Sequence, residues 1–233
     1  DPKDDLLKQY EQGKAMMSRK WPDAKPIAYF QAFTNTYAPL ETLKTFFEPF
    51  INMGEVLALA IATRADCLND QTIAYLDGLC DKKDIYLELG LQSIHDKTAK
   101  AMNRGHDYQT FLNTYEKLKK TKLKTVIHIM NGYPTEAKWM MVETAKAVGA
   151  LKPYGIKIHM LNVLDHTALG RAYQIKPFTL LDQVEYEELV IHQLQLIPPE
   201  VVIMRLTGDG DAQDVLAPDW VKNKVSVLNG IDK

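Results

Sequence analysis

Residues 56–63 read VLALAIAT, and no charged side chain interrupts this run. A strand with one face in water alternates apolar and polar residues, so an unbroken apolar run of strand length indicates a strand that is buried on both faces. Such strands belong to parallel sheets whose two faces are covered by other structure. The run therefore favours an α/β fold built on parallel strands.

Segments with strand and helix character alternate along most of the chain. Apolar runs of strand length occur at residues 25–33, 56–63, 85–91, 123–131, 155–163 and 201–206. Apolar residues at helical spacing fill the intervals at residues 39–51, 69–80, 108–120, 136–151 and 179–196. This order predicts a parallel sheet with covering helices. We expect one domain over residues 1–233, in which residues from about 208 onward form an extension packed against the rest.

Composition excludes several classes of protein. Hydrophobic residues make up 46% of the chain, enough for a substantial core, and the net charge of -2 gives no strong bias toward nucleic acid. No apolar run reaches the roughly 18 residues that a membrane-spanning helix needs. The two cysteines, Cys67 and Cys80, do not make a disulfide framework, so we expect a protein of the reducing cytoplasm.

The strongest indication of a ligand site lies in residues 84–107, DIYLELGLQSIHDKTAKAMNRGHD. The segment begins as a strand, is predicted to turn at Gly90, and continues into a helix that breaks at Gly105. In barrels of alternating strands and helices, ligands bind at the carboxyl ends of the strands. Polar residues that suit a zwitterionic, hydroxylated ligand follow most of the predicted strands: Gln31, Thr34, Asn35, Thr63, Arg64, Glu88, Gln92, His128, His159, Asn162 and Arg205.

These residues also have structural interpretations. The Glu88 carboxylate can fix the end of a strand without binding a ligand, and Arg64 can pair with Asp66. His128 and His159 lie in apolar strands, where one histidine is more often a hydrogen-bonded core residue than a ligand. Three kinds of function stay open: a cofactor-dependent enzyme, a barrel hydrolase, and a non-catalytic barrel that binds a ligand or partner.

Four short stretches resemble a known family. They are ELGLQS (residues 88–93), NRGH (103–106), HIMNGYP (128–134) and ATRAD (62–66). Together they resemble the radical S-adenosylmethionine (SAM) enzymes, in the branch of the elongator catalytic subunit and oxygen-independent coproporphyrinogen oxidase, and within it an uncharacterised bacterial group. The resemblance covers about residues 27–206. It implies a partial (β/α)6 TIM-like barrel, here missing its first strand.

The resemblance also implies an activity. Family members use a four-iron, four-sulfur (4Fe–4S) cluster to cleave SAM reductively into methionine and a 5′-deoxyadenosyl radical, which abstracts hydrogen from a substrate. We expect an iron–sulfur oxidoreductase or transferase of this kind, with SAM and the cluster as cofactors and a reductant such as flavodoxin or ferredoxin. The substrate is unknown, with a tRNA and a small molecule both possible, and no membrane is involved.

The resemblance also implies which residues contact the cofactor. Relatives hold the methionine amine with a Gly-rich segment, and residues 31–34 take its place here without those glycines. No catalytic residue is assigned. The resemblance assigns these residues to cofactor binding: Gln31, Ala32, Thr34, Thr63, Arg64, Glu88, Gln92, Arg104, His128 and Asn162.

The cysteines depart from the family pattern. Members hold the cluster through three cysteines in a CxxxCxxC loop, whereas Cys67 and Cys80 are too few and too far apart. We expect the cluster cysteines upstream of Asp1, together with the first barrel strand, and expect no metal site and no activity from these 233 residues alone. Loss of that strand would leave the predicted strand at residues 27–33 as an open edge. We expect the chain either to self-associate through this edge or to cover it with its own N-terminal or C-terminal segment.

Overall fold

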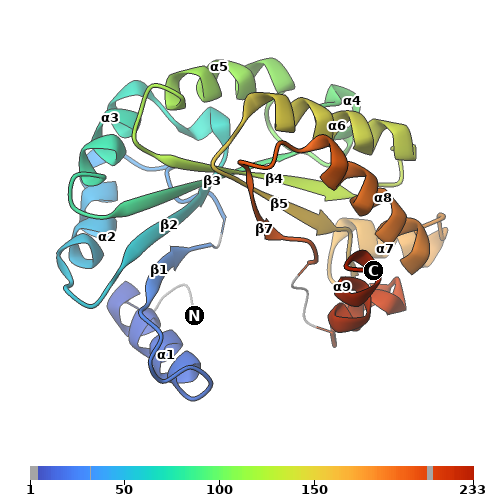
Figure 1. The fold of residues 1–233 in the computed structure, drawn as a ribbon, viewed down its shortest axis with the longest axis horizontal. Coiled ribbons are helices and arrows are strands. Elements are labelled where there is room, and N and C mark those ends of the chain that lie inside the picture. Colours follow the sequence, from blue (N-terminus) through green and yellow to red (C-terminus); the bar gives the residue numbers. More distant parts are fainter. Residues whose placement is uncertain (1–4, 32, 209–211) are drawn as a thin grey trace. The chain divides into compact units, whose positions relative to one another are not determined.

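The computed structural model describes residues 5–31, 33–208 and 212–233, and strands and helices alternate through them (Figure 1). The predicted α/β class is confirmed. The chain divides into two compact units. Unit 1 comprises residues up to Leu89 together with 113–125, and unit 2 comprises residues 90–112 together with those from Val126 onward.

Unit 1 contains parallel strands that follow one another in the sheet. Ile27 pairs with Ala58, which in turn pairs with Asp84. The elements up to this point of the chain are α1 (Leu6–Ser18), β1 (Ile27–Phe30), α2 (Leu40–Asn52), β2 (Ala58–Thr63), the 3₁₀ turn η1 (Ala65–Cys67), α3 (Asp70–Leu79) and β3 (Asp84–Gln92), whose last three residues belong to unit 2.

The core of unit 1 lies between β1, β2 and α2. Figure 1 shows α2 and α3 on the same side of β1 and β2. The α2 side chains Phe47 and Phe50 meet the Phe30 ring edge-to-face, with centroids 5.0 and 5.3 Å away. Leu59 and Ile61 of β2 are fully buried, and their neighbours Ala58 and Ala60 are buried as well. Strand β2 is therefore covered on both faces, as its unbroken apolar sequence predicted.

Unit 2 contains a second parallel group, β4-β5-β7, and a small antiparallel pair, β6-β8. Its predicted strands and helices are confirmed with shifts of a few residues at their ends. The elements from β3 onward are α4 (Asp96–Ala101), α5 (Tyr108–Leu118, which is divided between the units), β4 (Lys124–Asn131), α6 (Lys138–Leu151), β5 (Gly155–Met160), β6 (Val163–Leu164), α7 (Ala168–Ile175), α8 (Gln183–Leu196), β7 (Val202–Arg205), β8 (Val215–Ala217), the 3₁₀ turn η2 (Asp219–Lys222) and α9 (Lys224–Ile231).

A buried amide pair joins β4 to the helices of unit 2. The side chains of Asn131 and Gln193 exchange hydrogen bonds of 2.8 and 2.9 Å, and Gln193 also donates to the Met141 carbonyl oxygen. Both amides are almost completely buried. Asn131 therefore faces α6 and α8, and its amide serves the packing of unit 2.

The tail after residue 208 contains regular structure. Helix α9 packs against α8, where Gln183 donates to Ser226 at 2.8 Å. Helix α7 was not predicted, because residues 168–175 carry no long apolar stripe; the Thr167 hydroxyl caps it by accepting from the amide of Gly170.

The sheet has the strand order β1-β2-β3-β4-β5-β7, so β1 stands at one end of it. Its side chains Ile27 and Tyr29 are 45% and 38% exposed. Self-association through this edge stays a prediction. Among the described residues, no helix is long and apolar enough to cross a membrane.

Candidate functional site

The strand ends of unit 1 carry a buried carboxylate. Glu88 of β3 is only 2% exposed, and its Oε2 accepts a hydrogen bond of 2.6 Å from the phenol of Tyr29 on β1. A buried carboxylate requires such donors, because an isolated charge away from water is very unfavourable. Strand β1 thus supplies a donor for a carboxylate two strands away.

Thr63 and Arg64, at the end of β2, form hydrogen bonds within unit 1. The hydroxyls of Thr63 and Thr36 lie 2.6 Å apart, and Thr36 also donates to the carbonyl oxygen of Cys67 at 2.8 Å. The Arg64 guanidinium pairs with Asp66 through two hydrogen bonds, the one from Nε being 2.9 Å long. The hydrogen bonds to Asp66 raise the pKa of Arg64 further above its usual value. The geometry therefore supports the interpretation that Arg64 pairs with Asp66.

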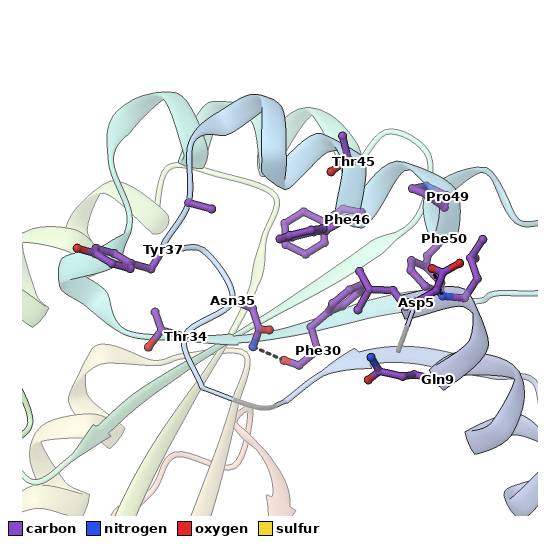
Figure 2. Close-up of a pocket in the computed structure, with 14 residues that line it drawn as sticks. Asp5, Gln9, Phe30, Thr34, Asn35, Tyr37, Thr45, Phe46, Pro49 and Phe50 are labelled. Carbon is purple, nitrogen blue, oxygen red and sulfur yellow. Dashed lines mark hydrogen bonds between the residues drawn. The ribbon is translucent and has the colours of Figure 1, made fainter. Parts of the chain in front are cut away.

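A cavity of about 550 Å³ lies beside β1, and Figure 2 shows its lining. The predicted cofactor residue Thr34 lines it, next to Asn35, whose amide donates to the Phe30 carbonyl oxygen at 2.9 Å. Gln31 is exposed, and Ala32 lies outside the described residues. The rest of the lining is mainly apolar and comes from α1 and its N-cap, the end of β1, α2 and the segment between β1 and α2: Asp5, Leu6, Leu7, Gln9, Phe30, Tyr37, Ala38, Thr45, Phe46, Phe47, Pro49 and Phe50.

In unit 2 the guanidinium of Arg104 and the amide of Gln92 converge above Gly90. A Cβ atom at Gly90 would lie 2.7 Å from Nη2 of Arg104 and 3.2 Å from Nε2 of Gln92, closer than the guanidinium tolerates. The predicted turn at Gly90 is wrong, because β3 continues through Gly90 to Gln92. The missing side chain of Gly90 leaves the space that the two polar groups occupy, and a larger residue there would displace the flexible end of Arg104.

The segment that carries Arg104 is fixed by tight turns. Helix α4 ends at Ala101, four residues before the predicted break at Gly105. Asn103 and Gly105 then adopt positive φ values of 53° and 90°, and the backbone N–H of Arg104 donates to the Ala99 carbonyl oxygen at 2.8 Å. These turns fold the chain back, so Arg104 reaches the end of β3.

Gln92 combines a strained backbone with an unsatisfied oxygen. Its φ is +72°, in a region that side chains other than glycine rarely adopt. Its Oε1 is buried and accepts no hydrogen bond from the residues that the structure describes. Strain and a buried polar atom without a protein partner each destabilise the fold, and both occur preferentially where a site serves a ligand.

Asn162, which follows β5, shows the same feature. Its Oδ1 is buried and has no hydrogen-bond partner in the described part of the chain. Its Nδ2 lies 3.2 Å from the position that a Cβ would take at Gly208. Asn162 is therefore a second amide whose oxygen is available to a donor.

His128 of β4 contacts the other strand histidine. Its ring lies 5.1 Å from the ring of His159 on β5, with the two planes tilted by 37°. Both side chains are half-buried. Each imidazole can donate or accept, according to its tautomer.

Two contributors to these groups were missed in the sequence analysis. Tyr29 was assigned to the apolar part of its strand, although strand alternation places it and Ile27 on one face and Ala28 on the other. Gly90 was interpreted as a turn signal. A glycine inside a strand can equally mark a place that another group approaches closely, and this was the available signal.

Comparison with known proteins identifies the family. Residues 27–148 match the sequence model of the radical SAM superfamily, and residues 153–233 match that of the radical SAM C-terminal domain. The chain belongs to the radical SAM superfamily. The predicted resemblance is thereby confirmed, and superfamily membership implies SAM and a 4Fe–4S cluster as cofactors.

Two curated relatives extend over nearly the whole chain. The uncharacterized protein YtqA of Bacillus subtilis is 44% identical over 230 residues, which cover 99% of this radical SAM chain and 71% of the relative. Protein YhcC of Escherichia coli K12 is 30% identical over 211 residues, which cover 89% of this chain and 67% of the relative.

The fold is similar to that of a solved archaeal structure, Methanocaldococcus infernus Elp3 with an N-terminal deletion. The TM-score is 0.72 at 18% identity, over 94% of this chain and 57% of that one, so the chain spans less than two thirds of Elp3. Together with the strand order, this likeness confirms a partial (β/α)6 barrel as the fold class.

The two radical SAM cofactors fit the described residues differently. SAM offers a carboxylate for Arg104 and hydroxyl donors for the unsatisfied oxygens of Gln92 and Asn162. No group of three or more His, Cys, Asp or Glu residues that could hold a metal ion occurs among the described residues. Burial raises the pKa of the Cys80 thiol to about 11, so it stays protonated at neutral pH. With Cys67 as the other cysteine, the chain's own residues do not fit a 4Fe–4S cluster.

Proposed function

We propose that the protein is a radical SAM enzyme and that unit 2 of this chain binds SAM through Gln92, Arg104 and Asn162. The observation that carries the proposal is the convergence of the Arg104 and Gln92 side chains above Gly90 in a chain of this superfamily. Thr63, Arg64 and Glu88 of unit 1, which the resemblance also assigns to the cofactor, form hydrogen bonds to side chains of their own unit.

The chemistry of these side chains matches the ligand. A guanidinium binds a carboxylate through two parallel charge-assisted hydrogen bonds, which suits Arg104 to the methionine carboxylate of SAM. The Gln92 and Asn162 oxygens accept hydrogen bonds, which suits them to the ribose hydroxyls or the exocyclic amine of adenine. His128 offers a further donor or acceptor for the same ligand.

The proposed reaction is reductive cleavage of SAM, which supplies a hydrogen-abstracting radical to a substrate that is not identified. We propose that thiolates outside these 233 residues hold the 4Fe–4S cluster, because Cys67 and Cys80 are too few for it. The part of this chain is to bind and orient SAM and to exclude water from it. The proposed reductant is an electron-transfer protein of the flavodoxin or ferredoxin class, in the cytoplasm.

A barrel hydrolase is the weaker candidate. Metal-dependent hydrolases need three or more ligands that converge on one ion. The described residues contain no such group. We therefore favour the radical SAM function over the hydrolase function.

The test is SAM binding by the complete gene product, reconstituted with iron and sulfide under anaerobic conditions. Gly90→Ala should weaken SAM binding about tenfold, because the new methyl group displaces the flexible end of Arg104 while the backbone stays in place. Isothermal titration calorimetry gives the dissociation constants, and S-adenosylhomocysteine serves as a ligand that cannot be cleaved.

Gly78→Ala is the matched control. Gly78 lies inside α3, and a Cβ there would meet no atom within 4 Å, so SAM affinity should stay at the wild-type value. Circular dichroism spectra establish that both variants are folded. Wild-type affinity in a folded Gly90→Ala protein contradicts the assignment.

A further inference from the structure

The residue after Gln92 anchors the end of β3. The Ser93 side chain is only 3% exposed, and its hydroxyl donates a hydrogen bond to Oε1 of Glu136. The same hydroxyl oxygen accepts from the backbone N–H of His95 at 3.1 Å. A buried hydroxyl that both donates and accepts has a fixed orientation. Ser93 therefore holds the chain at the point where it leaves the strand.

Glu136 belongs to the loop between β4 and α6, residues 132–137. The backbone N–H of Glu136 donates to the Tyr133 carbonyl oxygen at 2.9 Å, which closes a four-residue turn. Pro134 occupies the second position of this turn, where the fixed φ of proline is favourable. The Glu136 carboxylate is thus presented to Ser93 by a turn whose shape the local sequence sets.

Further contacts join the same two segments of unit 2. The backbone N–H of Ile94 donates to the Thr144 hydroxyl at 3.4 Å, and that hydroxyl donates to the Met140 carbonyl oxygen at 3.1 Å. The ring Nε2 of His95 lies 3.0 Å from the same carbonyl oxygen. Residues 93–95 are therefore attached to α6 and to the loop before it.

These contacts follow directly after the strained backbone of Gln92. A residue other than glycine keeps a positive φ only where its surroundings over-determine the conformation. The φ of Gln92 is +72°, and the three residues after it each contact α6 or the preceding loop. A carboxylate accepts a stronger hydrogen bond than a hydroxyl or carbonyl oxygen does, so the bond to Glu136 contributes most to this anchor.

We propose that Glu136 is a positioning residue for the cofactor site, which acts through Ser93 to hold Gln92 in the conformation that binds SAM. This inference rests on the proposed function and adds to it a residue that does not touch the ligand. The Gln92 amide converges with Arg104 above Gly90. Relaxation of the Gln92 backbone to a negative φ would turn its side chain away from that place, so the anchor preorganises the site.

The test is a double-mutant cycle on SAM binding by the complete gene product, reconstituted with iron and sulfide under anaerobic conditions. Glu136→Leu removes the acceptor and should weaken binding about fivefold, because Gln92 then populates other conformations. In the Gln92→Gly background the same substitution should change the affinity by less than about twofold, since the amide that it positions is already absent. Isothermal titration calorimetry gives the four dissociation constants, with S-adenosylhomocysteine as the ligand that cannot be cleaved.

Two further variants serve as controls. The amide oxygen of Glu136→Gln can accept from Ser93, so its SAM affinity should stay within about twofold of the wild type. Glu188→Leu removes a glutamate at an exposed position of α8 in the same unit and should bind SAM normally. Circular dichroism spectra establish that every variant is folded.

Hydrogen exchange of the protein without SAM reports the conformation itself. The amides of Ile94 and His95 bond to side chains whose positions depend on this anchor, so residues 92–95 should exchange faster in Glu136→Leu than in the wild type. Exchange in Glu136→Gln should match the wild type. Faster exchange throughout β4 and α6 in Glu136→Leu would show a general loss of structure and would contradict a role confined to Gln92.

Two results of the cycle would overturn the proposal. One is an equal loss of SAM affinity from Glu136→Leu in the wild-type and Gln92→Gly backgrounds, because Glu136 would then act independently of Gln92. The other is wild-type affinity in folded Glu136→Leu. If Gly90→Ala weakens SAM binding and Glu136→Leu does not, the cofactor site stands and the positioning role fails. If Gly90→Ala retains SAM affinity, the cofactor site itself fails, and with it the role of Glu136 in SAM binding.

Discussion

The polar strand ends of the two units differ in where their hydrogen bonds go. In unit 1, Thr63, Arg64 and Glu88 bond to side chains of the same unit. In unit 2, the oxygens of Gln92 and Asn162 are buried without a partner among the described residues. A buried polar atom normally has a partner, so the unsatisfied oxygens of unit 2 support the proposed ligand site, whereas the bonded groups of unit 1 stabilise the fold.

This difference in hydrogen bonding divides the residues assigned to the cofactor into two groups, which the sequence alone did not separate. The family resemblance assigns strand-end residues from both units to the cofactor, because all of them follow parallel strands. Their hydrogen bonds separate Thr63, Arg64 and Glu88, which bond within unit 1, from Gln92 and Asn162, whose buried oxygens have no partner among the described residues. Substitutions should therefore affect either folding stability or ligand affinity, according to the unit.

The largest effect is expected for Arg104→Ala. Loss of a charge-assisted hydrogen bond should weaken SAM binding by about 1.5–3 kcal/mol, or roughly ten- to a hundredfold. Equilibrium dialysis of the reconstituted protein measures the affinity, and urea unfolding should show little change in stability. A large loss of stability with unchanged affinity would reverse the comparison, because Arg104 would then behave like the residues of unit 1.

Thr63→Val should show the opposite behaviour. The substitution removes the buried hydroxyl pair with Thr36 and should lower the free energy of unfolding by about 1–2 kcal/mol. SAM affinity should stay within about twofold of the wild type, because Thr36 keeps its bond to the Cys67 carbonyl oxygen and the strand end is preserved. Urea denaturation and calorimetry measure the two quantities; a tenfold loss of affinity would place Thr63 in the cofactor site.

Gln92→Gly should move the two quantities in opposite directions. Glycine adopts the φ of +72° without strain and removes a buried unsatisfied oxygen, so the free energy of unfolding should rise by about 1 kcal/mol. SAM affinity should fall about tenfold, because the amide is lost. Urea denaturation and calorimetry measure the two quantities. A fall in the free energy of unfolding would show that the Gln92 side chain supports the fold.

The smallest effect is expected for Arg64→Ala. Its partner Asp66 is only two residues away and both side chains are partly exposed, so the ion pair should contribute less than about 1 kcal/mol. SAM binding should be unchanged at both low and high salt. A salt-dependent loss of SAM affinity would show that Arg64 contacts the ligand and would move it into the group of Arg104.

Much of the fold follows from local sequence. The unbroken apolar run at residues 56–63 predicted a strand buried on both faces, and Ala58 to Ile61 are buried as expected. The alternation of strand-length apolar runs with segments of helical periodicity predicted a parallel sheet with covering helices. This worked because the apolar pattern of each segment reflects which of its faces is buried. Helix α7 was missed because it has only eight residues, too few for a helical apolar pattern to stand out in the sequence.

The site was less predictable, because it depends on geometry between distant residues. The sequence placed Gln92 and Arg104 near a strand end, but only the structure shows that Gly90 makes room for both. Nor does any local pattern show that Thr63 bonds to Thr36, since the partner follows a different strand. A bulge, such as the one at Met204 in β7, is likewise invisible in the alternation of so short a strand.

The bulge in β7 has a consequence for how this protein can diverge. The face to which Arg205 projects is set by one additional residue, Met204, in a strand at the end of the sheet. Deletion of a single codon would turn the guanidinium toward the apolar face that carries Ile156 and Ile158, while every other strand keeps its pairing. One genetic step can therefore redirect a charged side chain of this sheet without a new fold and without any substitution at the residues proposed to bind SAM.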